Sequence, residues 1–151
     1  MIEIKHCDLC PKLCGADRTK TTGLCGGGGL PKLARAALHH WEEPCISGTY
    51  GSGAVFFSGC SMCCCYCQNA QISAENFGKE VDVERLAEIF LNLQEQGAHN
   101  LNLVSGSHYT PWVIEALKRV RPALHIPVVW NSSGYERVET LRALEGYVQI
   151  Y

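Results

Sequence analysis

Three cysteines in one short stretch, Cys60, Cys64 and Cys67, have the residue type and the spacing that bind iron. Their pattern is C-x3-C-x2-C, so a single loop could present three thiolates to a cubic iron–sulfur cluster. The fourth iron of such a cluster would then have no protein ligand. Clusters that only carry electrons are ordinarily held by four cysteines. The spacing therefore predicts a cluster that does chemistry, with one iron open to a substrate or cofactor.

Two more cysteines, Cys63 and Cys65, lie within the same stretch but off this pattern. Free cysteine is often a small buried apolar residue, but five cysteines within eight residues are too many for packing alone. We interpret Cys63 and Cys65 as non-ligands that pack beside the loop. A register through Cys60, Cys63 and Cys67 is the alternative, and it reverses the order of the two spacings.

A second set of cysteines lies near the N-terminus, with the spacing C-x2-C-x3-C-x10-C. Four thiolates suit either a zinc ion in a closed structural site or a four-cysteine cluster. Cys45 could replace one of these ligands or remain a free thiol. The segment is poor in apolar residues, and a bound metal could supply the energy that orders it. We expect residues 1–52 to be a metal-binding segment with little regular structure, and its ligands to be Cys7, Cys10, Cys14 and Cys25.

The composition narrows the class of protein. With 151 residues, of which 46% are apolar, the chain can form one globular core. A formal net charge of −2 gives no electrostatic reason to expect a nucleic acid or an anionic membrane as partner. The sequence contains neither a long apolar run nor a secretory signal. Metal ligation in a reducing cytoplasm therefore explains the ten cysteines better than disulfides do.

From Gly53 onward the sequence alternates between short apolar runs and amphipathic stretches. The connections are too long for hairpins, which is typical of parallel βα units. In such barrels the active site lies at the C-terminal ends of the strands. We therefore expect an α/β fold in which residues 53–151 form one unit. The expected strands are 54–57, 100–104, 126–130 and 147–151, and the expected helices are 83–96, 111–121 and 137–144.

The cysteine loop resembles that of the radical S-adenosylmethionine superfamily, in which an aromatic residue precedes the third cysteine, as Tyr66 does here. Residues 38–48, 56–60, 100–104 and 130–136 are similar to one branch of that superfamily. This branch is usually described as similar to pyruvate formate-lyase activating enzymes. The likeness covers nearly the whole chain.

The resemblance implies a parallel (βα) partial barrel of about six units, in the general manner of a βα barrel. This chain supplies three units and the start of a fourth strand. We therefore expect an N-terminal fragment of a longer enzyme, inactive by itself. A split protein completed by a second polypeptide is the alternative.

The same resemblance implies which residues contact S-adenosylmethionine. In the family, the backbone beside the aromatic residue faces the adenine. A Gly-Gly-Glu-like turn holds the methionine amino group, and here only Gly106 fits that pattern. Polar residues after the third strand could hydrogen-bond the ribose or the carboxylate, or form a turn into the next helix. His108 could touch the cofactor or have a structural role. The expected cofactor contacts are Tyr66, Ser105, Gly106, Ser107, Asn131 and Ser133.

The implied function is reductive cleavage of S-adenosylmethionine to a 5′-deoxyadenosyl radical that abstracts hydrogen. The branch suggests that the substrate is a glycyl-radical-type partner enzyme, and that a flavodoxin or ferredoxin donates the electron. A different class remains as the alternative, namely an electron-transfer or scaffold module that uses both cysteine sets and cleaves nothing. Such a carrier would need a fourth protein ligand on its cluster, whereas the enzyme would not.

Overall fold

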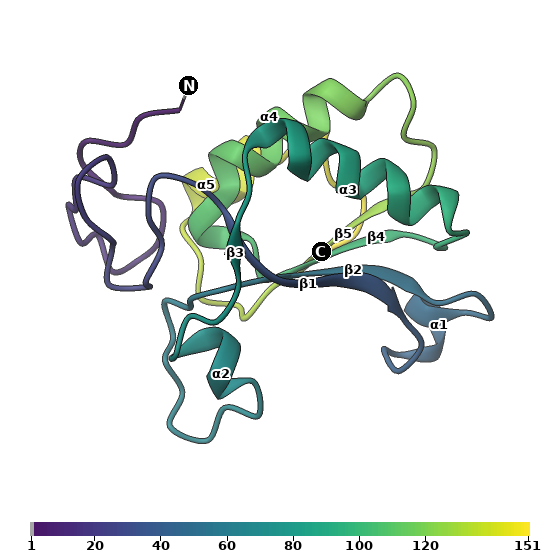
Figure 1. The fold of residues 1–151 in the computed structure, drawn as a ribbon, viewed down its shortest axis with the longest axis horizontal. Helices are drawn as coiled ribbons and strands as arrows, with labels where there is room; N and C mark the ends of the chain where they lie inside the picture. The colour runs from purple at the N-terminus through teal and green to yellow at the C-terminus, as the bar shows by residue number, and fades with distance from the viewer. Residues whose placement is uncertain (1) are drawn as a thin grey trace.

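Two helices, α3 (Val83–Glu95) and α4 (Thr110–Val120), cover one face of a sheet in the computed structural model, which describes residues 2–151 (Figure 1). Within that range the sheet has five strands in the order β3-β1-β2-β4-β5. The shorter helices α1 (Pro44–Ser47), α2 (Ala70–Ser73) and α5 (Val138–Ala143) lie around its ends. The strands are β1 (Lys32–His39), β2 (Ser52–Phe57), β3 (Lys79–Glu80), β4 (Leu101–Val104) and β5 (Val128–Asn131).

The sheet is mixed, with parallel pairing on one side and antiparallel pairing on the other. β2, β4 and β5 pair in parallel, so that Leu101 lies between Gly53 and Val128. β1 runs antiparallel to both of its neighbours, β2 and β3. The expected parallel pairing is therefore confirmed for these three strands. The expected strand at 147–151 is reduced to a single bridge to β5, and the partial barrel stays a prediction.

β1 corrects the expectation that the chain is irregular up to about residue 52. Residues 2–31 contain no helix or strand, as expected, but β1 is eight residues long. Its sequence is rich in alanine and basic residues, which are poor strand formers. Backbone pairing with β2 on one edge and β3 on the other overrides that local preference. Because this pairing involves residues outside β1, the residues of β1 alone do not predict a strand.

The longest helix shows how local sequence sets the ends of an element. The Asp82 carboxylate accepts a hydrogen bond of 2.7 Å from the backbone N–H of Arg85, which satisfies one free amide of the first turn of α3. Gly97 follows the last turn, as is common at helix C-termini. None of the helices within residues 2–151 combines the length and the apolar character needed to cross a membrane.

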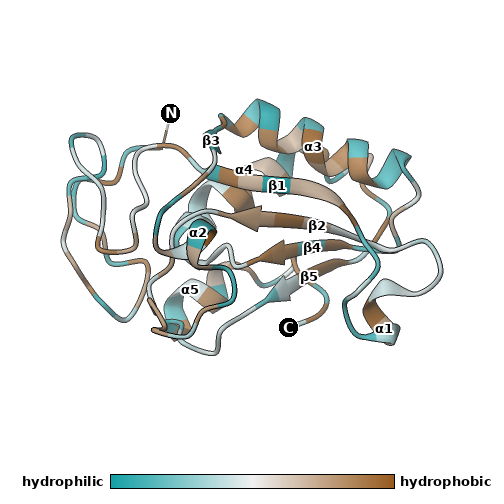
Figure 2. Ribbon diagram, turned by 60° about the horizontal axis from the view of Figure 1, so that its bottom comes forward, coloured by the Kyte–Doolittle hydropathy of each residue, from teal (hydrophilic) through white to brown (hydrophobic). Residues whose placement is uncertain are grey.

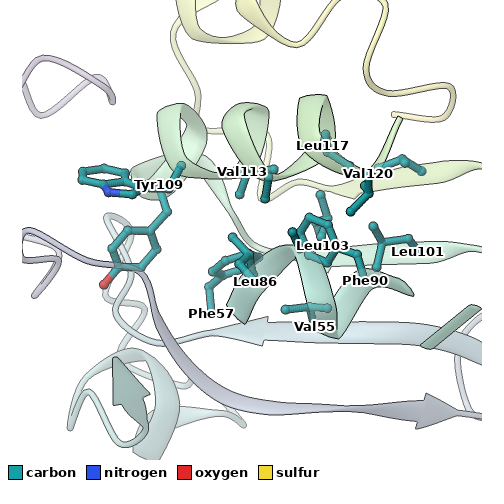
Figure 3. Packing of buried hydrophobic residues seen from close by; sticks show 14 of the residues in the cluster. Val55, Phe57, Leu86, Phe90, Leu101, Leu103, Tyr109, Val113, Leu117 and Val120 are labelled. Carbon is teal, nitrogen blue, oxygen red and sulfur yellow. The ribbon is translucent and has the colours of Figure 1, made fainter. Parts of the chain in front are cut away.

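An apolar core fills the space between the sheet and the two helices (Figure 3). Successive side chains of a strand point to opposite faces, so alternate residues of each strand enter the core. One stripe of each helix faces the same core, because residues three and four apart share a helix face. The core includes Val55 and Phe57 of β2, Leu101 and Leu103 of β4, Leu86 and Phe90 of α3, and Val113, Leu117 and Val120 of α4.

The opposite face of the sheet carries no helix over its centre within the described range (Figure 2). α2 and the loop before it lie at one end of this face, and α1 lies at the other end. Strand alternation places Phe56, Val104 and Asn131 on this open face, because their neighbours enter the core. On this face Ala54, Asn102 and Val129 are buried as well, so the half-buried residues at the carboxyl ends of β2, β4 and β5 are the part available to a ligand.

Truncating Phe90 tests the packing of α3 against the sheet. The side chain is fully buried, so Phe90→Ala is expected to lower the free energy of unfolding by about 3–5 kcal/mol through lost contacts and a cavity. Glu95→Ala, at an exposed position of the same helix, is the matched control and should stay within about 0.5 kcal/mol. Urea denaturation of the purified protein measures both. Equal unfolding midpoints for the two variants would contradict the packing described here.

Candidate functional site

The three-cysteine loop leaves the sheet at the carboxyl end of β2 and leads into α2. We call residues 59–69 the cluster loop. Gly59 begins it with a φ of +85°, and a Cβ at this position would lie 2.3 Å from the carbonyl oxygen of Cys25. The backbone N–H of Cys60 donates to that same oxygen at 3.0 Å. Glycine is therefore required where the cluster loop passes the N-terminal segment.

The three predicted ligands differ in exposure. Cys60 and Cys67 are half-buried, whereas Cys64 is exposed. The Cys60 sulfur accepts a hydrogen bond of 3.4 Å from the N–H of Met62, and the Cys67 sulfur accepts one of 3.3 Å from the hydroxyl of Ser73. Hydrogen bonds to ligand sulfurs are among the features that tune a bound cluster. Two of the three sulfurs are thus already held by the loop and by α2.

Most of the remaining side chains of the loop, from Met62 to Tyr66, are exposed. Cys63 and Cys65 are exposed, so they do not pack beneath the loop as buried apolar residues would. The Cys63 thiol donates a hydrogen bond of 3.1 Å to the carbonyl of Cys60. The Tyr66 side chain is 88% exposed, which leaves its backbone as the part that could face an adenine.

The thiol set of this loop fits a cluster better than it fits a single ion. Within residues 2–151, no three Cys, His, Asp or Glu side chains lie close enough together to hold one metal ion. A single zinc ion, with Zn–S bonds of about 2.3 Å, draws its sulfurs to within about 4 Å of one another. A four-iron cluster takes each thiolate on a different iron and so holds its sulfurs farther apart. Three free thiols on one accessible loop match the second arrangement.

The turns after β4 and β5 are joined by one carboxylate that the sequence reasoning missed. Glu136 accepts hydrogen bonds from the hydroxyl of Ser107, from the indole N–H of Trp130 at 2.9 Å and from the hydroxyl of Ser132 at 2.6 Å. These donors come from both turns, so Glu136 holds the end of β5 against the residues that follow β4. The only sequence signal was its place in the segment 130–136, which gives no hint of these tertiary contacts.

The predicted cofactor contacts fall into two groups. The hydroxyl of Ser105 donates to the backbone oxygen of Asn131 at 2.8 Å, which joins the two turns directly. Gly106 packs against the indole of Trp130, and a Cβ there would lie 2.9 Å from the ring. Ser133 is exposed and accepts only a local contact of 3.4 Å from the N–H two residues on. The structure therefore brings Ser105, Gly106, Ser107 and Asn131 together, and leaves Ser133 and Tyr66 at the surface.

A groove of about 580 Å³ lies on the open face of the sheet beside the cluster loop. It collects residues from β1, β2, β4, β5 and the end of the loop, where the parallel strands present their carboxyl ends. The ring of His39 meets that of Phe56 edge to face, with 5.9 Å between centroids. Its lining includes Arg35, His39, Phe56, Gln68, Val104 and Asn131, of which only Asn131 was expected from the sequence.

The N-terminal cysteines converge in the segment before β1. Cys7, Cys10 and Cys25 are buried and Cys14 is half-buried. A Cβ at Gly23 would lie in ordinary contact with both the Cys14 sulfur, at 3.4 Å, and the Cys25 sulfur, at 3.5 Å, so these two sulfurs lie beside the same residue. Cys45 lies in α1, at the opposite end of the molecule (Figure 1). The four predicted ligands thus share one segment, away from Cys45, although no three of them lie close enough together for a single metal ion.

His108 lies behind the cluster loop and does not face the groove. It belongs to the short 3-10 helix η1 (Ser107–Tyr109), and its Nε2 lies 2.8 Å from the carbonyl oxygen of Ser58. Burial lowers the pKa of His108 from 6.5 to about 4, so the ring is neutral at pH 7 and donates this hydrogen bond. Of the two roles considered for His108, the contacts favour the structural one.

Comparison with known protein families assigns the chain to one of them. Residues 47–149 match the family described as 4Fe-4S single cluster domain. The chain belongs to this family. The match includes the whole cluster loop, and it begins after the four N-terminal cysteines. This 4Fe-4S single cluster domain is therefore an iron–sulfur protein, and a [4Fe–4S] cluster is its expected cofactor.

The 4Fe-4S single cluster domain described here is similar to an uncharacterized protein of Methanocaldococcus jannaschii. The two are 30% identical over 157 aligned positions. The alignment covers 97% of this chain and 44% of the relative, so the chain spans less than half of the length of the relative it matches. No solved structure matches the chain.

The buried His108 predicts a pH dependence of stability. The unfolded chain takes up a proton between pH 6.5 and about 4 that the folded protein does not, so this contribution to stability is complete above pH 6.5 and is lost as the pH falls toward 4. His108→Gln, which can keep the bond to Ser58, is expected to reduce the loss between pH 7 and pH 5 by about 2 kcal/mol. Urea denaturation at both pH values measures it.

His125→Gln, at an exposed position, is the matched control. Between pH 7 and pH 5 it should lose as much unfolding free energy as the unsubstituted protein does. If His108→Gln showed the same loss as well, His108 would not be the group that resists protonation.

Proposed function

We propose that this chain carries the cluster-binding part of a radical S-adenosylmethionine enzyme. The observation that carries the proposal is the position of three thiols on one loop, at the carboxyl end of the first parallel strand and beside an open groove. Ligands of α/β folds bind at that end of the strands. The helix-free face of the sheet corresponds, in this proposal, to the inside of a partial barrel (Figure 2).

The number of ligands separates an enzyme from an electron carrier. Cys60, Cys64 and Cys67 would bind three irons of the [4Fe–4S] cluster, and the fourth iron would accept S-adenosylmethionine. When bound, the reduced cluster supplies the electron that cleaves S-adenosylmethionine to methionine and a 5′-deoxyadenosyl radical, which abstracts hydrogen from the substrate. The remaining cysteines of the loop, Cys63 and Cys65, do not complete a carrier site in this proposal, because they lie off the C-x3-C-x2-C spacing.

The two turns joined by Glu136 would position the cofactor. The groove volume, about 580 Å³, lies within the range of small-molecule sites, about 300–1,000 Å³. The side chain of Asn131 lines the groove and offers both a donor and an acceptor. The Ser107 hydroxyl donates to Glu136, so a contact with the methionine amino group would fall to backbone atoms near Gly106. The chain thus contributes orientation and exclusion of water, and the cofactors contribute the bond cleavage.

The partners follow from the resemblance and from the exposure of the loop. A flavodoxin or ferredoxin would deliver the electron, and the exposure of the Cys64 and Tyr66 side chains is consistent with its approach to the loop. Activation of a glycyl-radical-type enzyme, by removal of a glycine hydrogen, is the activity that the branch suggests. That last step rests on family likeness and is an associational argument.

Anaerobic turnover tests the proposed function. The full-length natural protein, reduced and supplied with S-adenosylmethionine, is expected to release 5′-deoxyadenosine and methionine, which liquid chromatography with mass spectrometry quantifies. Cys64→Ala should lower both products to the level of the protein-free control, because it removes a cluster ligand. Cys65→Ala, one position further along the same exposed loop, is the matched control and should keep both the iron and the products.

A protein that assembles and reduces its cluster, yet releases no 5′-deoxyadenosine, would favour the electron carrier over the enzyme. Loss of the cluster from Cys65→Ala together with its retention in Cys64→Ala would show that the ligand register is wrong.

A further inference from the structure

Arg18 is the one basic side chain in the N-terminal segment that is almost completely buried, at 2% exposure. Its Nε donates to the carbonyl of Gly28 at 2.9 Å, and its Nη1 donates to the carbonyl of His108. The guanidinium lies 4.8 Å from the ring centroid of Trp112 and 5.0 Å from that of Tyr109. The remaining nitrogen, Nη2, has no hydrogen-bond partner and is shielded from solvent.

No negative charge balances this buried cation. Among residues 2–151, each ion pair involves another basic residue, and no carboxylate pairs with Arg18. Carbonyl oxygens and aromatic rings attract a guanidinium, but they do not neutralise it. A buried charge without a partner is strongly destabilising. The carboxylates of residues 2–151 therefore leave the buried charge of Arg18 unbalanced.

The N-terminal cysteines lie close to Arg18. Its Nη2 lies beside Gly27, whose carbonyl accepts a hydrogen bond of 2.9 Å from the N–H of Gly23, and the sulfurs of Cys14 and Cys25 lie beside Gly23. Cys7, Cys10 and Cys25 are buried, and thiols that are not bound to a metal carry no negative charge that could balance Arg18. A coordinated thiol, in contrast, is deprotonated by the metal, and four thiolates around a zinc ion or a cluster carry a net negative charge.

We propose that Cys7, Cys10, Cys14 and Cys25 bind a thiophilic metal centre as thiolates and that Arg18 is its buried counter-charge. The proposal is independent of the function proposed for the cluster loop. Zinc and iron–sulfur centres share ligation by four thiolates. Because no three Cys, His, Asp or Glu side chains within residues 2–151 lie close enough together for one metal ion, an iron–sulfur cluster, which holds its thiolates farther apart, fits these cysteines better than a single zinc ion does. The positive charge at position 18 then strengthens metal binding, and packing against Trp112 is a secondary contribution of the same side chain.

Metal content tests the first half of the proposal. In the full-length natural protein, replacing Cys60, Cys64 and Cys67 by Ala removes the ligands of the cluster loop, so that any metal left belongs to another site. After anaerobic purification, elemental and sulfide analysis should find either one zinc ion or a set of irons with sulfide in each chain. Both results support the site and identify its metal. Adding Cys25→Ser should remove that metal, whereas adding Cys45→Ser, the matched control, should not.

Two substitutions of Arg18, made in the protein that lacks Cys60, Cys64 and Cys67, test whether Arg18 is the counter-charge of the metal centre. Arg18→Met keeps an unbranched apolar stem without the charge, and Arg18→Lys keeps the charge. Competition with a chelator should show at least about a tenfold loss of metal affinity in Arg18→Met, the scale typical of groups that support metal ligands. Arg18→Lys should lose markedly less metal affinity than Arg18→Met.

The sign of the stability change separates counter-charge from packing. Without metal, Arg18→Met should raise the melting temperature, because it removes an unbalanced buried cation. With metal, the same substitution should lower it. If Arg18→Met proves too poorly folded to measure, the thiolate-to-cobalt absorption of the Arg18→Lys protein provides the readout, and it should match that of the protein with Arg18.

Any of five results would overturn the proposal. The triple Cys→Ala background could contain no metal, or could keep its metal after Cys25→Ser. Arg18→Met could bind metal as tightly as the protein with Arg18, or lower the melting temperature equally with and without metal, as expected of a residue that only packs. A cobalt complex without thiolate absorption would exclude cysteine ligation.

Discussion

The hydrogen bond from the N–H of Cys60 to the carbonyl of Cys25 joins the two cysteine-rich parts of the molecule at one point. Gly59 makes this contact possible, because any side chain there would collide with the same carbonyl. Cys25 thereby touches both sites, with its carbonyl on the cluster loop and its thiol in the N-terminal set. The position of the cluster loop at the end of β2 thus depends on the order of a segment that has no helix or strand from residue 2 to residue 31.

The two faces of the sheet differ in what covers them. One face packs against α3 and α4 and supplies the apolar burial that stabilises the domain. The other face, free of helices at its centre, carries the groove beside the cluster loop. Glu136 and Ser105 hold the polar turns at the edge of that groove, so the loops that would touch a cofactor are fixed to the rigid sheet. The proposed radical reaction would require preorganised contacts of this kind.

Features set by neighbours in the sequence could be predicted from the sequence. The spacing of Cys60, Cys64 and Cys67 predicted a cluster on one short loop, and the family match agrees with a [4Fe–4S] cluster, whereas the choice of these three ligands stays a prediction. The helix α3 was predicted over 83–96 and lies at Val83–Glu95, because its apolar period is a local signal.

Features that depend on tertiary contacts could not be predicted in this way. β1 forms through pairing with distant strands and against its own propensity. Glu136 looks like a surface residue in the sequence, and only the folded chain shows its three donors. Arg18 would be placed at the surface on residue type alone, yet it is buried. The expected strand at 147–151 shows only one bridge, because its formation depends on pairing that the local apolar run does not reveal.

The central claim is that the cluster loop leaves one iron without a protein ligand. Mössbauer spectroscopy of the iron-57-enriched, full-length natural protein tests it most directly, with spectra taken before and after addition of S-adenosylmethionine. The account predicts that one iron of the loop cluster differs from the other three and that its signal alone shifts when S-adenosylmethionine is added. Four equivalent cysteine-ligated irons, unchanged by S-adenosylmethionine, would contradict the account.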